Sequence, residues 1–543
     1  MSVARRGAAT IDAAPRSNSR AGVAFGVGDN AAAWLAWALA IALLFAWGLG
    51  AGPLFDVDEG AFAEATREML ASGDWLHTTL NGADRFDKPI LVYWLQAASL
   101  LAFGENEAAV RLPSAICAWI WCLSVAHFAR PRFGAAAALA GATVLATSVG
   151  VLVIGRAATA DALLNVLLVL SLFDLWRHLE SGARAPLRRA AVWMGLGLLA
   201  KGPIAVLIPG ATLMLLALLR RESRPRIAAM LRDPVAWLLL VAIAAPWYAY
   251  AVHRHGRAFI DGFIMKHNVG RFTTTLEGHS GGPLYYALVL PLVMLPWTPL
   301  LMRVLMQARA TWRTPLGAWL LLWAGFVFAF FSLSGTKLPH YLLYGLTPLA
   351  LLAGAAMVAP LARGWRIAQL AAVAATLALL VATPWLALQF AARVQQPFYR
   401  ALISGAPSPP WAPAAAAILV LVLLALLPVR SRRLGSGRVL AMGWVVALFA
   451  VGAAMPWWAE ALQGPVARAA DAARALRGRE PGLRVVQAGL NQPSFAWRYG
   501  APVPHRSPAP GDVVLIRIDR PLPGANDTLF SERGIALQRV APR

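Results

Sequence analysis

The feature that most constrains this chain is a series of long apolar runs separated by short polar loops. The runs begin near residue 31 and recur as far as residue 457. Most have roughly the 20-residue length needed to cross about 30 Å of hydrocarbon, and a few are short enough to require tilt or merging. About thirteen spans are predicted, over 31–51, 110–129, 134–154, 161–178, 189–201, 203–219, 233–252, 283–302, 316–335, 340–358, 367–386, 412–428 and 439–457. The sequence therefore predicts an all-α polytopic membrane protein.

Composition agrees with this class and decides what the net charge means. Hydrophobic residues make up 59% of the chain and charged residues only 14%, against about 25% charged in a typical soluble domain. The net charge of +23 would suggest a nucleic-acid partner in a soluble protein. Here the arginines lie between hydrophobic spans, so no nucleic-acid partner is expected. The two cysteines, Cys117 and Cys122, lie in one apolar run, which excludes a disulfide framework.

The distribution of basic residues predicts the orientation in the membrane. If the N-terminus is cytosolic, 24 of the 49 Lys and Arg residues lie in the tail and the inside loops, 13 lie outside, and 12 lie in the last 76 residues. This asymmetry follows the positive-inside rule for a bacterial inner membrane protein. An odd number of spans then places the C-terminal segment in the periplasm.

Three regions are predicted. Residues 1–30 carry four arginines among Ala, Gly and Ser without a cleavage pattern, which predicts a disordered cytosolic tail. Residues 31–458 form the transmembrane domain, and residues 459–543 have a soluble composition. Within the last region, a helix at 460–476 and strands at 483–486, 512–518 and 535–540 predict a small α/β domain. This region carries no catalytic or ligand-binding motif, so a structural or partner-docking cap is expected there.

The first outside loop, residues 52–109, holds most of the acidic residues that could do chemistry. Its acids alternate with aromatic and apolar residues, so it is not a disordered acidic linker. Apolar spacing predicts amphipathic helices along the membrane surface at Glu59–Ser72 and Pro89–Phe103. Asp58 and Glu59 lie at the water boundary, where a carboxylate can act as a general base or bind an amine or cation. The same two residues could equally cap the following helix.

Cations occur at several breaks on the outside face. Lys88 lies between Asp87 and Pro89 at the start of a predicted helix, and Lys201 and Lys337 interrupt apolar stretches. Arg156 and Asp161 flank the second outside loop. Each of these could bind an anionic head group, and each could instead be a helix cap or an interfacial charge.

Histidines in the fourth outside loop raise a metal hypothesis. His253, His255, His267 and His279 match no compact zinc spacing. A carboxylate such as Asp87 could still meet His267 in space, and we keep this pair as a hypothetical metal site.

The order of these motifs resembles a known family. Asp58-Glu59, Ala63-Glu64, Arg67–Leu70 and Phe86–Trp94 resemble the first periplasmic loop of the aminoarabinose transferase and protein O-mannosyltransferase superfamily. Further matches follow in order over about residues 35–350: Arg156 with Asp161, Lys201-Gly202-Pro203, His267–Phe272, His279-Ser280-Gly281 and Lys337-Leu338-Pro339.

The resemblance implies a monomeric GT-C enzyme that transfers a sugar from undecaprenyl phosphate, or a similar polyprenyl phosphate, with inversion, to lipid A, another glycan or a protein. It implies catalytic roles for Asp58 and Asp161. It implies substrate binding by Glu59, Lys88, Arg156, Lys201, Arg271, Lys337 and Tyr341, with Lys88 on the donor phosphate. Asp87 and His267 resemble positions where relatives have been associated with a metal, which would be Zn or Mg/Mn, although a required metal is not established for the class.

The chain departs from the family pattern in one place near Asp58. Close aminoarabinose transferases continue the Asp-Glu pair with a polar residue, Arg and Tyr, whereas this chain has Gly60, Ala61 and Phe62. Asp87 also replaces the more usual Glu. A transporter or flippase of polyprenyl-linked sugars is the alternative. Transporters usually carry polar groups at mid-membrane and two similar halves, and neither is evident in the sequence.

Overall fold

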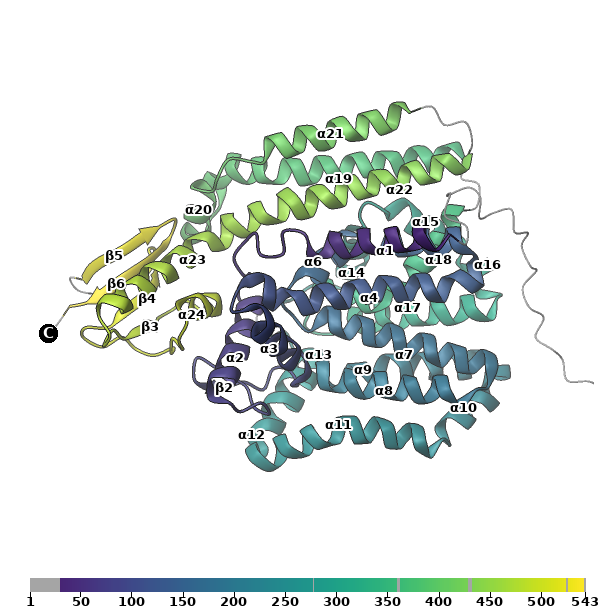
Figure 1. Ribbon diagram of the computed structural model, residues 1–543, viewed down its shortest axis with the longest axis horizontal. Helices are drawn as coiled ribbons and strands as arrows, with labels where there is room; N and C mark the ends of the chain where they lie inside the picture. Colours follow the sequence, from purple (N-terminus) through teal and green to yellow (C-terminus); the bar gives the residue numbers. More distant parts are fainter. Residues whose placement is uncertain (1–29, 277, 359–361, 428–431, 524–525, 542–543) are drawn as a thin grey trace, which may run out of the picture.

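The computed structural model describes residues 30–276, 278–358, 362–427, 432–523 and 526–541. These residues form an elongated helical bundle with a small β-sheet at one end, beside the C-terminus (Figure 1). The predicted cytosolic tail lies outside the described residues except for Asn30. The Asn30 side chain accepts a hydrogen bond from the Ala32 amide and so caps the first helix, α1 (Ala31–Ala46).

Long apolar helices dominate the bundle and confirm a polytopic helical fold. Seven segments of the described chain are long and apolar enough to cross a membrane, and three bent helix pairs raise the number to ten if each pair is one span. The predicted count of about thirteen stays a prediction. The seven segments are α4 (Glu107–Phe133), α7 (Asp161–Ser181), α11 (Pro234–His255), α17 (Pro315–Leu333), η4 with α18 (Pro339–Gly345 and Leu346–Val358), α19 (Arg363–Gln389) and Ser436–Arg479.

The bent pairs and the shorter helices complete the bundle. The pairs are α5 (Ala135–Ala146) with α6 (Val149–Arg156), α9 (Ile204–Leu219) with η2 and α10 (Arg221–Ser223 and Arg224–Leu231), and α14 (Tyr285–Val293) with α15 (Thr298–Met306). The remaining helices between α1 and the last long segment are α2 (Asp58–Ser72), α3 (Leu91–Phe103), α8 (Arg184–Lys201), α12 (Arg257–Phe259), η3 (Ile260–Gly270), α13 (Arg271–Thr273), α16 (Ala308–Trp312), η5 (Ala391–Arg393), α20 (Pro397–Ser404) and α21 (Trp411–Leu426).

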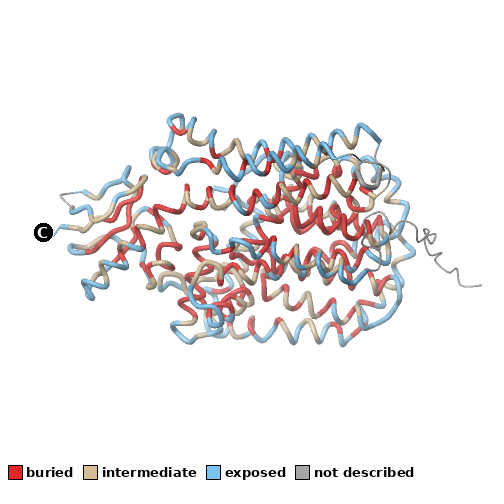
Figure 2. Tube along the Cα trace, turned by 45° about the horizontal axis from the view of Figure 1, so that its top comes forward, coloured by how far each residue is buried: buried red, intermediate tan, exposed pale blue. Residues whose placement is uncertain are grey.

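Small residues allow the central helices to approach closely. Gly354 of α18 lies so near Gly141 of α5 that a Cβ added at Gly354 would come within 2.3 Å of the Gly141 amide nitrogen. Such close backbone contact is typical of helix packing in lipid. Figure 2 shows buried residues concentrated inside the bundle and exposed residues along its outer helices. Exposed leucines on α21, such as Leu419 and Leu426, form a surface suited to lipid.

The two helices predicted in the first outside loop are present, but α2 does not lie with one face in solvent. Every residue from Glu59 to Met69 is buried, because α3 and the C-terminal helix α24 (Pro493–Tyr499) pack against α2. Its acids are paired within the protein: Glu64 forms an ion pair with Arg67 at 2.6 Å. The loop also contains a short hairpin of β1 (Thr79–Leu80) and β2 (Ala83–Asp84).

The C-terminal residues form a four-stranded sheet on a long helix. One helical segment runs without a break through α22 (Arg432–Phe449), η6 (Ala450–Ala454) and α23 (Met455–Arg479). The sheet order is β3-β4-β6-β5, with β3 and β4 parallel and the other pairs antiparallel. The strands are β3 (Val485–Gln487), β4 (Val513–Arg517), β5 (Asn526–Glu532) and β6 (Ile535–Val540). Strand β5 and helix α24 were not predicted.

The C-terminal segment contacts the first outside loop directly. The Ser494 amide donates to Asp56 at 2.8 Å, and the Ser494 hydroxyl also donates to that carboxylate. Arg498 forms an ion pair with Glu107 at 3.0 Å, and the Val503 amide donates to Asn81. These contacts place the sheet over the same end of the bundle as the first loop (Figure 1).

Candidate active site

Three cations from separate parts of the sequence gather around one pocket, which we call the basic pocket. Lys88 precedes α3, Lys201 ends α8 and Arg271 begins α13. The cavity has a volume of about 180 Å³. Its walls are Asp87, Lys88, Lys201, Pro203, Ile204, Leu207, Phe263, His267, Asn268, Arg271, Phe272, Phe330, Phe331, Ser334, Tyr341 and Tyr344. A phosphate-sized anion with an apolar tail matches this combination of charge and aromatic lining.

The neighbouring cations of the basic pocket perturb Lys88. Burial, together with the charges of Lys201 and Arg271, lowers the pKa of Lys88 to about 7. The Lys88 ammonium donates to the Asp87 carbonyl at 3.0 Å. Arg271 donates to the Tyr341 hydroxyl at 3.2 Å. A bound anion would relieve the repulsion among these cations.

Asp161 lies beside the basic pocket and provides the counter-charge to Lys201. The Lys201 ammonium donates to Asp161 Oδ1 at 2.5 Å, and the Tyr344 hydroxyl donates to the same atom at 2.5 Å. His340 Nε2 lies 3.5 Å from that oxygen. Asp161 is therefore fixed in place at the start of α7 by groups from two other elements.

Asp87 and His267, the predicted metal ligands, form an ion pair. His267 Nε2 lies 2.6 Å from Asp87 Oδ1, and Arg85 lies 3.0 Å from the other carboxylate oxygen. Burial would raise the pKa of the Asp87 carboxyl, but the hydrogen bond from His267 and the charge of Arg85 hold that pKa well below its usual range.

This geometry does not suit a metal held by Asp87 and His267 alone. The two side chains are hydrogen-bonded directly to each other, and Arg85 is paired with the other oxygen of Asp87. Among the described residues, no third His, Cys, Asp or Glu joins them to make a three-ligand group. Arg85 and Lys88 add positive charge next to the pair.

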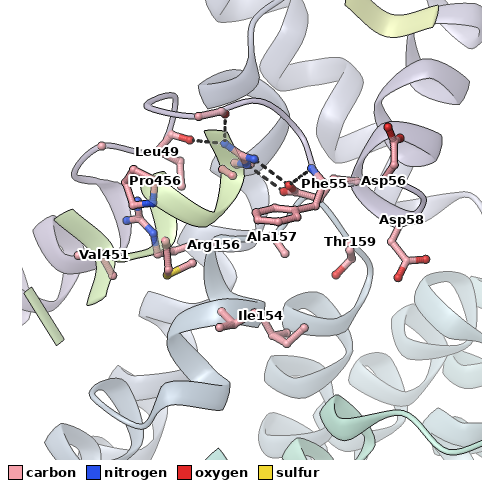
Figure 3. Close-up of a pocket in the computed structure, with 17 residues that line it drawn as sticks. Leu49, Phe55, Asp56, Asp58, Ile154, Arg156, Ala157, Thr159, Val451 and Pro456 are labelled. Carbon is pink, nitrogen blue, oxygen red and sulfur yellow. Dashed lines mark hydrogen bonds and ion pairs between the residues drawn. The ribbon is translucent and has the colours of Figure 1, made fainter. Parts of the chain in front are cut away.

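Asp58 lines a second cavity, of about 270 Å³, which we call the loop-one pocket. Asp58 is the first residue of α2, it is exposed, and its side chain makes no hydrogen bond or ion pair within the described part of the chain. Figure 3 shows its carboxylate pointing away from the hydrogen-bonded cluster in the same pocket. Asp58 is thus free to meet a substrate.

Glu59, predicted as a substrate ligand, is instead surrounded by donors from the protein. Arg111 donates to both of its oxygens at 2.9 and 2.7 Å, and the Phe55 and Ala158 amides donate as well. Arg111 also donates to the carbonyls of Leu49, Gly52 and Pro53. Burial would raise the pKa of Glu59, but Arg111 and the two amides lower it overall. The Glu59–Arg111 pair therefore fixes the backbone that leads to Asp58.

Two other predicted phosphate ligands are also bound to backbone. Arg156 lines the loop-one pocket and donates to the Leu44 and Phe45 carbonyls at 3.0 and 2.8 Å. Lys337 donates to the carbonyls of Ser332 and Ser334 at 2.7 and 2.8 Å. The structure brings neither residue into the lining of the basic pocket, whereas Lys88, Lys201, Arg271 and Tyr341 all lie there.

The two pockets are linked through His340. This side chain interacts electrostatically with Asp58 as well as with Asp161, Lys201 and Lys88. Thr159 lines the loop-one pocket, and Asp161 follows two residues later. The sequence motifs assigned no role to His340 or Tyr344. A signal for Tyr344 existed: it lies three residues after Tyr341 on the 3₁₀-helix η4, where residues i and i+3 share a face.

Known proteins resemble this chain in sequence and in fold. Residues 87–250 match a family described as dolichyl-phosphate-mannose-protein mannosyltransferase. An undecaprenyl phosphate-alpha-4-amino-4-deoxy-L-arabinose arabinosyl transferase from Pseudomonas fluorescens Pf-5 is 33% identical over 337 residues, which are 59% of this chain and 56% of that protein. The Pseudomonas aeruginosa PAO1 enzyme of that name is 33% identical over 57% of each chain. The match thus spans little more than half the length of these relatives.

The crystal structure of ArnT from Cupriavidus metallidurans bound to undecaprenyl phosphate superimposes over 94% of this chain and 98% of that one, with a TM-score of 0.79 and 23% identity. The chain is similar in sequence to the aminoarabinose transferases, and it shares the GT-C fold of this structure. The fold match extends well beyond the sequence match and includes the C-terminal residues. The GT-C fold that was expected from the motifs is therefore confirmed.

Proposed function

We propose that this GT-C protein is a membrane glycosyltransferase that moves a sugar from undecaprenyl phosphate, or a similar polyprenyl phosphate, to a periplasmic acceptor such as lipid A, with inversion. The observation that carries the proposal is the basic pocket, in which Lys88, Lys201 and Arg271 converge beside Asp161 and within electrostatic range of an unpaired Asp58. The similarity to an undecaprenyl phosphate-alpha-4-amino-4-deoxy-L-arabinose arabinosyl transferase supports the choice of donor.

The basic pocket supplies the main catalytic effect. The donor is a phosphodiester, and its phosphate becomes a dianion as the bond to the sugar breaks. Lys88, Lys201 and Arg271 are already in place around that charge, so they stabilise the leaving phosphate without rearranging. The aromatic residues Phe330 and Phe331 line the same pocket and suit the first isoprene units of the lipid.

Asp58 is assigned to the acceptor. Its carboxylate is exposed in the loop-one pocket, where it can accept a proton from an attacking hydroxyl or phosphate group or hold an amine of the donor sugar. Inversion requires the acceptor to attack opposite the leaving phosphate. The placement of Asp58 and Lys88 in two linked pockets is compatible with that requirement. Asp161 is a positioning residue in this scheme, because it orients the Lys201 ammonium.

The contacts between loops support an active site that faces the periplasm. Segments predicted to be cytosolic contact one another, through Arg132 with Glu180, Arg188 with Asp233 and Arg220 with the Trp312 carbonyl. Segments predicted to be periplasmic also contact one another, through Glu59 with Arg111, Lys201 with Asp161 and Arg271 with Tyr341. With the positive-inside rule, this pairing favours an inner membrane location with both pockets at the periplasmic end.

The test is turnover by purified protein in lipid nanodiscs with a radiolabelled polyprenyl-phosphate sugar and lipid A. Asp58→Asn is expected to lower turnover by roughly 10²-fold or more, since general acid–base groups contribute 10²–10⁴-fold. Lys88→Ala is expected to lose a similar factor because one fixed cation no longer faces the leaving phosphate. The matched controls are Asp527→Asn and Lys266→Ala, which change exposed charges outside both pockets.

Wild-type turnover in both Asp58→Asn and Lys88→Ala would refute the assigned roles. Movement of labelled lipid between leaflets, without any glycosylated product from a panel of lipid, glycan and protein acceptors, would instead indicate a transporter. Mass spectrometry of lipid A, glycans and secreted proteins from cells with and without the gene would name the acceptor by a sugar-sized mass difference.

A further inference from the structure

A second cluster of ionisable side chains lies outside both pockets. His77 precedes β1, Asp84 lies in β2, and His255 is the last residue of α11. One ligand atom from each of the three lies within 4.8 Å of the others. His77 Nε2 is 3.0 Å from one Asp84 oxygen, and His255 Nδ1 is 3.9 Å from the other. The two imidazole rings face each other with centroids 4.3 Å apart.

One atom of this cluster is buried without a partner. His255 Nε2 is inaccessible to solvent and makes no hydrogen bond with the described residues. Buried polar atoms in proteins are normally hydrogen-bonded, so an unpaired imidazole nitrogen calls for an explanation. Both histidine side chains are 13% exposed, whereas Asp84 is 54% exposed. The cluster is therefore built from two nearly buried imidazoles and one carboxylate that opens to solvent.

This donor set has the chemistry of a zinc site. Two imidazole nitrogens and one carboxylate oxygen leave a fourth tetrahedral position for water. Ligand atoms on one zinc ion lie roughly 3.4 Å apart, because each is about 2.0–2.2 Å from the metal. Binding would open the 3.0 Å separation of His77 Nε2 from Asp84 slightly and shorten the longer separations, and the exposed Asp84 side chain can rotate to allow this. The nearby Arg254 guanidinium is directed towards Asp74, at 3.9 Å.

The cluster joins two segments that build the basic pocket. Phe86 packs on the His255 ring at 5.1 Å and on Phe259 at 5.8 Å, and it immediately precedes Asp87 and Lys88. The chain that continues from His255 reaches η3, which carries His267, the partner of Asp87. The Trp247 indole of α11 also donates to the Leu76 carbonyl of the first outside loop at 3.0 Å, so the two segments are in contact without a metal.

We propose that His77, Asp84 and His255 bind one zinc ion, or a divalent cation of similar preference, at the joint between the first outside loop and the end of α11. The ion binds one ring nitrogen of His255 and adds a second link between these two segments. The metal site stands independently of the proposed transferase activity. The ion is expected to hold Lys88 more firmly in the basic pocket. The effect of this on donor binding rests on the proposed transferase activity.

The experiment titrates chelator-treated, full-length protein in nanodiscs with ZnCl₂ and measures heat and metal content. Wild type is expected to bind about one equivalent with high affinity. Asp84→Asn and His255→Asn are expected to weaken that affinity by at least roughly 100-fold, since even the loss of a residue that only hydrogen-bonds to a metal ligand lowers metal affinity 10–100-fold. Cobalt substitution should give the visible absorption of a tetrahedral site in wild type and lose it in both variants.

Two control variants locate the ion. His253→Asn changes an exposed histidine of the same segment and should bind zinc like wild type. His267→Asn removes the partner of Asp87 and should also retain binding. Asp84→Asn changes an exposed residue, so it keeps the test valid if His255→Asn does not fold.

Absence of zinc binding in wild type, undiminished affinity in Asp84→Asn, or loss of binding only in His267→Asn would overturn the proposal. Turnover with and without added zinc is measured on the same samples. Zinc binding without any turnover would leave the metal site standing and count against the transferase.

Discussion

At the residue scale, Lys88 is the side chain whose environment makes the sharpest prediction. Burial and the neighbouring cations lower the pKa of Lys88 from an ordinary value near 10.5 to about 7. The folded protein therefore favours the neutral amine above pH 7. A bound phosphate favours the charged form. Binding above pH 7 must therefore take up a proton, and the affinity for the donor must fall as pH rises.

We expect the Kd of wild type for a polyprenyl-phosphate sugar to rise by up to about tenfold per pH unit between pH 7 and 9. The donor is a phosphodiester that stays singly charged over this range. The change in affinity therefore comes from deprotonation of Lys88. Lys88→Arg keeps its charge at all these values and should show a much flatter profile. The measurement is equilibrium binding in nanodiscs. A flat profile in wild type, or an equally steep one in Lys88→Arg, would contradict the pKa assigned to Lys88.

At the element scale, the packing of α2 against α24 explains a departure from the family pattern. Gly60 stands where close relatives have a polar residue. A Cβ at this position would lie 2.3 Å from Asp56 Oδ1 and 2.4 Å from the Ser494 amide nitrogen. The glycine is therefore required by the hydrogen bonds that join Asp56 to Ser494.

Gly60→Ala should destabilise the protein by about 1–3 kcal/mol, because the added methyl group forces α2 and α24 apart. The matched control is Gly478→Ala, in α23, where an added Cβ meets no atom within 4 Å and alanine should be neutral or stabilising by up to about 1 kcal/mol. Thermal unfolding in detergent compares the two. A Gly60→Ala protein as stable as wild type would show that α24 does not rest on α2 in solution.

At the scale of the whole molecule, the sidedness of the bundle can be tested chemically. Ser280 and Glu222 are exposed residues in loops predicted to lie on opposite sides of the membrane. A membrane-impermeant maleimide applied to spheroplasts should label Ser280→Cys strongly and Glu222→Cys only after lysis. The native Cys117 and Cys122 are buried, so wild type provides a low background. The reverse labelling pattern would place both pockets in the cytosol.

Local patterns were enough to predict several elements of this protein. The apolar runs predicted a polytopic helical bundle, because length and hydropathy act on each segment separately. The spacing around Phe62 and Met69 predicted α2, and the C-terminal strands β4 and β6 were predicted close to their bounds. The family resemblance, and not a local pattern, implied that Lys88, Lys201 and Arg271 bind the substrate, and the three residues line one pocket.

Partners distant in sequence were decided only by the tertiary structure. Glu59 and Arg156 resemble ligands in the sequence, but Arg111 and the carbonyls of α1 satisfy them, and no local pattern encodes such contacts. The same holds for Ser494 on Asp56 and for His255 beside His77 and Asp84, which join segments far apart in the chain. The sequence determined which charges exist and on which elements they lie. Packing decided which charges are paired, and so which remain free to bind a substrate or a metal.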